Sequence, residues 1–101
     1  MKTVPYNDLL HEQLRDPEQA AAYLTACLED SEEVFLLGLR HVAEAWGGVG
    51  KLAQESELNR ESLYRMLSDS GNPRFSSLGM ILSVLGLRLK IEPQPHEKKV
   101  A

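Results

Sequence analysis

The sequence has little of what secreted, membrane-spanning and disulfide-bonded proteins need. It contains one cysteine, Cys27, which excludes a disulfide within the chain and is typical of a reducing compartment. No apolar stretch approaches the roughly 20 residues that cross a bilayer. No basic segment followed by an apolar run stands near Met1, so we expect no signal peptide. We therefore expect a cytoplasmic protein with no membrane partner.

The sequence also lacks the motifs of common catalytic and cofactor sites. It has no glycine-rich phosphate loop, no HExxH and no serine with a plausible base. His41 and Glu44 have the spacing of two ligands on one helix face, but two ligands do not make a metal site. Cys27 falls on an apolar stripe, which favours a buried small hydrophobe over a nucleophile. We expect no enzyme activity, no cofactor and no metal.

Helix-forming residues dominate what is present. Leu, Ala and Glu are frequent, and 43% of the 101 residues are hydrophobic, which allows one domain with a modest core. We expect an all-α fold of five helices. The domain should span residues 1–91, with an N-terminal arm at 1–15 and a disordered tail at 92–101. Leu9, Leu10 and Leu14 leave open whether the arm forms a short helix or only docks on the body.

Capping residues place the first long helices. Asp16 followed by Pro17 predicts one helix start, and Ser31 predicts the next. Gly38 weakens the second of these helices and is expected to allow a close helix crossing. Gly47 and the glycine after it should end that helix.

The remaining elements are short. Two helices should lie near 50–56 and 60–67, and a last helix should run from Ser76 or Ser77 to Gly86. Beyond it, apolar residues alternate with basic ones in a pattern typical of a short strand: Leu87, Arg88, Leu89, Lys90, Ile91. We expect Trp46 and Phe75 in the core.

The two short helices have the pattern of a helix-turn-helix over about residues 50–67. Ala53 is the small residue that lets a second helix cross closely, Leu58 is the apolar turn residue, and Asn59 can cap the second helix. Leu63 and Met66 form the inner face of that helix. An ordinary helical hairpin with a solvated outer face is the alternative. Glu57 stands where such turns usually have glycine, so the turn could be rearranged.

A helix-turn-helix inserts its second helix into the major groove, where arginine can pair with guanine. The outward residues of that helix are the predicted base contacts, and the following loop holds the predicted phosphate contacts. The predicted DNA-binding residues are Asn59, Arg60, Glu61, Tyr64, Arg65, Ser70, Asn72 and Arg74.

Charge divides the chain into two halves. Residues 1–48 have three basic and nine acidic side chains, a net charge of −6, whereas residues 49–101 have eight and six, a net charge of +2. The halves therefore suit different partners, a cationic one for the first and an anionic one for the second. The acidic run at 29–33 fits a solvated corner as well as a partner-binding patch.

Three groups of residues resemble a known family. Residues 52–89, with Gly71-Asn72-Pro73 and the later Leu85-Gly86-Leu87, resemble the Xre, or lambda-repressor-like, helix-turn-helix family. Two earlier segments, 14–24 with its Asp-Pro-Glu and Ala-Ala-Tyr-Leu, and 43–48, are similar to HigA-like antitoxins, the addiction-module antidote proteins.

This resemblance implies an antitoxin of a type II toxin-antitoxin module that binds a small basic toxin of RelE/ParE-like fold. It also implies a homodimer that represses its own operon by binding double-stranded operator DNA. Tyr6, Leu9 and Leu10 are the expected toxin anchors, unless the arm only closes the core over the helix that starts at Asp16. Leu87, Leu89 and Ile91 are the expected dimer seam, unless that strand packs on its own domain. Two alternatives remain: a transcription regulator without a toxin, and an interaction module that no longer binds DNA.

Overall fold

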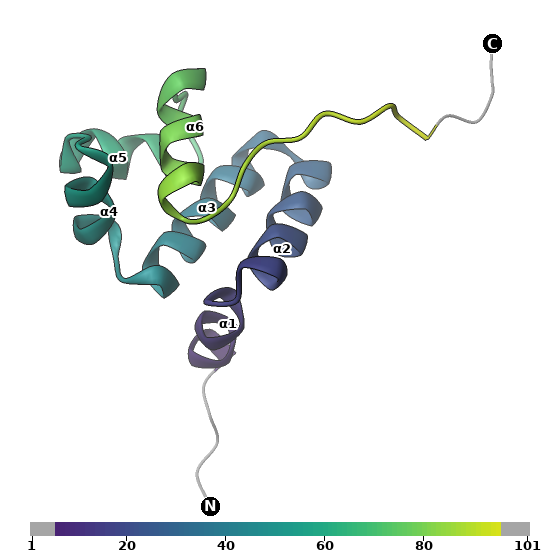
Figure 1. Ribbon diagram of the computed structural model, residues 1–101, viewed down its shortest axis with the longest axis horizontal. Coiled ribbons are helices and arrows are strands. Elements are labelled where there is room, and N and C mark those ends of the chain that lie inside the picture. The colour runs from purple at the N-terminus through teal and green to yellow at the C-terminus, as the bar shows by residue number, and fades with distance from the viewer. Residues whose placement is uncertain (1–5, 96–101) are drawn as a thin grey trace, which may run out of the picture.

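The computed structural model describes residues 6–95, with side chains from Leu9 onward, and this part of the chain is entirely helical and irregular, without a strand (Figure 1). The six helices are α1 (Tyr6–Leu14), α2 (Pro17–Asp30), α3 (Glu32–Trp46), α4 (Val49–Ser56), α5 (Arg60–Met66) and α6 (Phe75–Val84). The expected all-α class is confirmed, with one helix more than expected because the N-terminal arm forms α1. The predicted tail beyond Pro95 lies outside the described residues.

Polar caps begin the helices where the sequence predicts them. The Asp16 side chain accepts a hydrogen bond from the Glu18 backbone N–H at 3.0 Å, with Pro17 in the first helical position. The Ser31 hydroxyl accepts one from the Val34 N–H at 3.1 Å and starts α3. These bonds satisfy backbone donors that the first turn of a helix leaves unpaired.

α3 is the central helix of the fold. It packs against α1 and α2 on one side and α4 on the other, and α4 in turn packs against α5 and α6 (Figure 1). Gly38 makes the expected close crossing with α2, because a Cβ built on it would lie 2.7 Å from the Cys27 Sγ. Cys27 is buried, as expected. Burial raises the pKa of its thiol. A hydrogen bond with Tyr23 lowers this pKa, and the negative charge of Asp30 raises it further.

The core runs continuously through the molecule. Buried residues of α1 to α6 form one cluster, and its fully buried large side chains are Leu39, Leu52, Leu63, Leu67 and Ile81. Burying one such leucine stabilises the fold by about 1.5–3 kcal/mol. The helix-turn-helix is thus fixed by the same core that holds the N-terminal helices. No helix in residues 6–95 combines the length and apolarity that crossing a membrane demands.

α6 ends in a Schellman motif at Gly86. Gly86 has φ +81°, its N–H donates to the Ser83 carbonyl at 3.0 Å, and the Leu87 N–H donates to the Leu82 carbonyl at 2.7 Å. Beyond Leu87 the chain leaves the helices as an extended trace (Figure 1). The short strand expected at 87–91 is absent from the described residues, since a strand needs a partner strand and an all-helical body offers none.

Candidate nucleic-acid interface

The turn between α4 and α5 keeps the geometry of a helix-turn-helix despite its glutamate. Glu57 adopts the left-handed conformation, with φ 61° and ψ 25°, so the turn is not rearranged. Asn59 then caps α5, its side-chain oxygen accepting a hydrogen bond from the Ser62 N–H at 3.0 Å. Leu58 packs against the core as the turn requires, and Ala53 is partly buried beside it.

α5 has one buried face and one exposed face. Leu63 and Leu67 are fully buried, and Met66 packs partly against the core. Leu67, one turn after Leu63, is an inner-face residue that the sequence analysis did not name. The exposed residues are the four that the pattern predicts: Arg60, Glu61, Tyr64 and Arg65.

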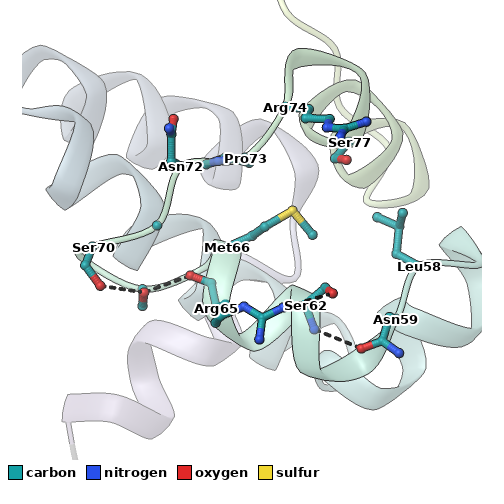
Figure 2. A pocket seen from close by; sticks show the side chains of 12 residues that line it. Leu58, Asn59, Ser62, Arg65, Met66, Ser70, Asn72, Pro73, Arg74 and Ser77 are labelled. Carbon is teal, nitrogen blue, oxygen red and sulfur yellow. Dashed lines mark hydrogen bonds between the residues drawn. The ribbon is translucent and has the colours of Figure 1, made fainter.

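A groove of about 500 Å³ lies between α5 and the start of α6 (Figure 2). It contains five of the eight predicted DNA-binding residues, together with three serines that the prediction missed. The five are Asn59, Arg65, Ser70, Asn72 and Arg74, and the serines are Ser62, Ser68 and Ser77.

The groove is lined with hydrogen-bond donors and two cations. None of the described residues that line it is acidic. Arg65 Nη2 donates to the Ser62 hydroxyl at 3.4 Å, and the Ser68 hydroxyl donates to the Arg65 carbonyl at 2.8 Å. Because the Asn59 oxygen is engaged as a cap, its amide N–H groups are the atoms left for a ligand. This chemistry suits an anion such as a phosphate diester.

The loop that closes the groove is held tightly at Gly71. A Cβ on Gly71 would collide with the carbonyl oxygen of Met66 and lie 2.8 Å from that of Arg65. The Gly71 N–H donates to the Ser68 carbonyl at 3.0 Å. Glycine is therefore the residue that lets the loop pass close to the end of α5, so that Arg74 lines the same groove as Arg65.

Arg60 and Tyr64 lie on the other flank of α5, away from the groove. The Arg60 guanidinium lies beside Gly50 of α4, 3.5 Å from the position of a Cβ there, and 5.9 Å from the centre of the Tyr64 ring. Arg40 of α3 approaches the same ring at 5.2 Å. The pattern could not reveal Arg40, since it is 24 residues away and reaches Tyr64 only through the fold. Glu61 is exposed.

Trp46 and Phe75, both expected in the core, differ in burial. Trp46 is partly buried and lies under the Lys51 ammonium, 4.5 Å from the ring centre. Phe75, which we expected in the core, is 78% exposed, so that expectation is wrong. α6 begins one residue earlier than predicted, and its inner face is formed by Leu78, Ile81 and Leu82.

The predicted toxin anchors lie on α1. Leu9 is 46% exposed, whereas Leu10 packs partly against the core; the Tyr6 side chain lies outside the described ones. The acidic run 29–33 is at the corner between α2 and α3 with its four carboxylates exposed. His41 and Glu44 have separate partners, Tyr23 at 3.0 Å and Arg40 at 3.4 Å, and residues 6–95 hold no metal-binding cluster.

Comparison with known proteins supplies the family. A family model described as "Probable addiction module antidote protein" matches residues 6–93. An uncharacterized protein of Haemophilus influenzae is 32% identical over 82 residues, which cover 80% of this chain and 84% of that protein. No solved structure matches the chain significantly.

Proposed function

The chain belongs to the family of probable addiction module antidote proteins, and from that premise we propose that it is a HigA-like, Xre-type antitoxin of a type II module. In this proposal it silences a small basic toxin of RelE/ParE-like fold by direct binding. It also represses its own operon by binding operator DNA through α4 and α5.

The groove between α5 and α6 is the observation that carries the DNA-binding part. It combines two arginines, hydroxyl and amide donors, and the cap of an exposed helix, without an acidic lining residue among those described. A net charge of −4 for the chain argues against non-specific attraction to DNA, so binding must depend on this local surface.

The proposal gives the predicted residues different roles. Arg65 projects from the exposed face of α5 at the groove, and we propose that it contacts a guanine edge in the major groove. Ser70, Asn72 and Arg74 follow on the loop, and we propose that they contact phosphate oxygens. Arg60 lies outside this groove, near Gly50 of α4 and the Tyr64 ring, so we propose a weaker contribution from it than from Arg65.

The proposed unit that binds DNA is a homodimer. One helix of seven residues contacts too few base pairs for useful specificity. Two copies related by a two-fold axis would read half-sites about one helical turn, roughly 34–36 Å, apart.

Comparing two arginine variants tests the DNA assignment. We expect Arg65→Ala to weaken operator binding by about 1–3 kcal/mol and relax specificity at one position. Arg74→Ala should weaken binding to all DNA sequences alike. It should also reduce the slope of log affinity against log salt concentration by about 1. Arg60→Ala should have a smaller effect than Arg65→Ala. Gel shifts at several salt concentrations measure all three.

Arg15→Ala is the matched control, because Arg15 is an exposed arginine at the α1–α2 turn. It should leave operator affinity unchanged. Equal affinity of Arg65→Ala, Arg74→Ala and the wild type would place DNA binding elsewhere or remove it altogether.

The proposed toxin surface is the acidic N-terminal half. Complementary charge speeds the encounter of an acidic and a basic protein, but affinity also requires an apolar anchor. Leu9 is exposed and meets that need, while Tyr6 and Leu10 extend the same helix. In this proposal the antitoxin silences the toxin by binding it.

A further inference from the structure

The segment after α6 has the properties of a strand without a partner. Residues 88–92 are extended and make no backbone hydrogen bond to another backbone group among the described residues (Figure 1). Apolar and charged side chains alternate along it, which is the period of a strand. Exposed extended backbone with that period is a template for strand addition.

Its apolar side chains are only partly covered by the molecule's own helices. Leu87 is partly buried against the core, Leu89 is 42% exposed, and Ile91 is 96% exposed. A cavity of about 330 Å³ runs between this segment and α2, where Leu28 is 48% exposed. Both the apolar Leu87 and Leu89 and the charged Arg88, Lys90 and Glu92 line this cavity, so one more strand beside the segment would cover it.

The charged residues of the segment favour pairing with the same segment of a second copy. In an antiparallel pair, residues directly opposite lie on the same face, so pairing the segment with itself keeps the apolar face intact. Centred on Lys90, the pairing sets Arg88 opposite the Glu92 of a second copy, twice, and Leu89 opposite Ile91. Opposite charges and apolar pairs in these positions are stabilising.

Neighbouring registers are worse. Moving the centre to Leu89 sets Arg88 opposite Lys90, which places like charges together twice. Moving it to Ile91 also pairs opposite charges, Lys90 with Glu92, but it replaces the Leu89–Ile91 pair by Leu89 opposite Pro93, which has no N–H for the ladder. We propose that two copies of this chain dimerise by antiparallel pairing of residues 88–92, centred on Lys90.

A two-stranded ribbon alone is marginal in water, so the ribbon needs a surface to cover. In this register the Ile91 side chain of the second copy lies beside Leu89, above the cavity that borders Leu28. The inference gives the dimer of the proposed function its surface, and its test needs neither DNA nor toxin.

Charge reversal tests the register. We expect Arg88→Glu and Glu92→Arg each to raise the dimer dissociation constant about tenfold, since both ion pairs become like-charge pairs. The double variant and an equimolar mixture of the two single variants should both recover dimerisation, because each restores opposite charges across the ribbon. Sedimentation equilibrium over a range of concentrations measures these constants.

Two exposed charges supply controls, Glu12 on α1 and Arg15 in the turn between α1 and α2. Arg15→Glu and Glu12→Arg should leave the dissociation constant unchanged. A second measurement uses oxidation: Lys90→Cys should form a disulfide between copies, whereas Arg88→Cys should not, because its two copies lie roughly 13 Å apart along the ribbon. Cys27 is buried and does not compete.

The outcomes separate this inference from the proposed function. If neither charge reversal changes the dissociation constant, or if Arg88→Cys cross-links two copies, the proposed strand pairing is wrong but the protein is still a dimer. If the wild-type chain is a monomer, the strand pairing and the proposed homodimer are both wrong. Recovery by the mixed variants without any operator binding sustains the pairing while the DNA-binding proposal fails.

Discussion

At the scale of single residues, Glu57 holds an unfavourable conformation. It is the only non-glycine residue with positive φ in the described part of the chain. The left-handed conformation costs a non-glycine residue about 1–2 kcal/mol, which glycine avoids. Glycine loses more conformational freedom on folding, and this offsets about 0.5–1 kcal/mol of the gain. We expect Glu57→Gly to raise the free energy of unfolding by about 0.5–1 kcal/mol in urea denaturation.

Glu57→Ala separates backbone strain from loss of the side chain. Alanine keeps the Cβ and therefore the strain, so this variant should gain nothing. If both variants unfold with the same free energy, the turn stores no strain that glycine relieves.

Gly38 is a second residue whose role depends on space. A Cβ there would lie 2.7 Å from Cys27 Sγ and 3.3 Å from Tyr23 Cε2, tighter than packed atoms allow. Gly38→Ala should therefore lower the free energy of unfolding by about 1–2 kcal/mol, despite the better helix propensity of alanine. In a Cys27→Ala background the sulfur is gone, and the same change should cost less.

The difference between the two backgrounds is a coupling energy, which a double-mutant cycle measures by denaturation. We expect a coupling of about 1 kcal/mol, favouring the double variant over the sum of the singles. Additive effects would mean that α2 and α3 separate freely and that the close crossing does not depend on Gly38.

At the scale of helices, the sequence predicted the helix ends that capping residues determine. Asp16, Ser31, Asn59 and Gly86 mark helix ends in the sequence, and each of them lies at a helix end in the structure. Caps act within one turn of the chain, so a sequence pattern can reveal them. α1 has a weaker signal, and only its packing against α2 and α3 decides between helix and arm.

Features that depend on contacts between elements could not be predicted in this way. The alternation at 87–91 is typical of a strand, but pairing requires a second strand that the described chain does not supply. Phe75 has the composition of a core residue, yet the orientation of α6 leaves it exposed. The sequence pattern predicted Arg60 and Arg65 on one exposed face of α5. In the structure Arg60 lies near α4, whereas Arg65 lines the groove beside α6.

The candidate site shows the same division. The eight predicted residues follow from a periodic pattern and one loop, and five of them meet in the groove. Ser62 and Ser77 have no distinguishing local signal, because a serine lines a groove only if a distant segment forms the opposite wall. Gly71 in its Gly-Asn-Pro loop is the local residue that brings the two walls together.

At the scale of the whole molecule, the acidic corner and the loop of the groove meet at one edge, because Glu32 lines the same pocket as Gly71 and Asn72. Figure 1 shows α4 and α5 on one side of α3 and α2 on the other. The acidic corner 29–33 and the exposed Leu9 belong to the helices before the turn at Gly47, while the groove belongs to those after it. In the proposed function, the toxin anchor on α1 and the operator contacts on α5 therefore belong to different helices.

Point variants test this separation better than removal of the N-terminus. α1 packs against α2 and α3, with Leu14 buried, so deleting residues 1–12 would expose core and disturb the fold. Leu9 is 46% exposed, and its replacement by glutamate removes the anchor while leaving the core intact.

We expect Leu9→Glu to weaken toxin binding at least about tenfold and to leave operator affinity unchanged, with Arg65→Ala showing the reverse. The apolar contact of a buried leucine accounts for that size of loss, and the added negative charge would not repel a basic toxin. Calorimetry with the proposed toxin gives the toxin affinity, and gel shifts give the operator affinity. Circular dichroism and thermal unfolding must first show that both variants fold like the wild type. If Leu9→Glu binds toxin as tightly as the wild type does, α1 is only a structural helix, and the acidic corner 29–33 becomes the next surface to test, by Glu32→Lys.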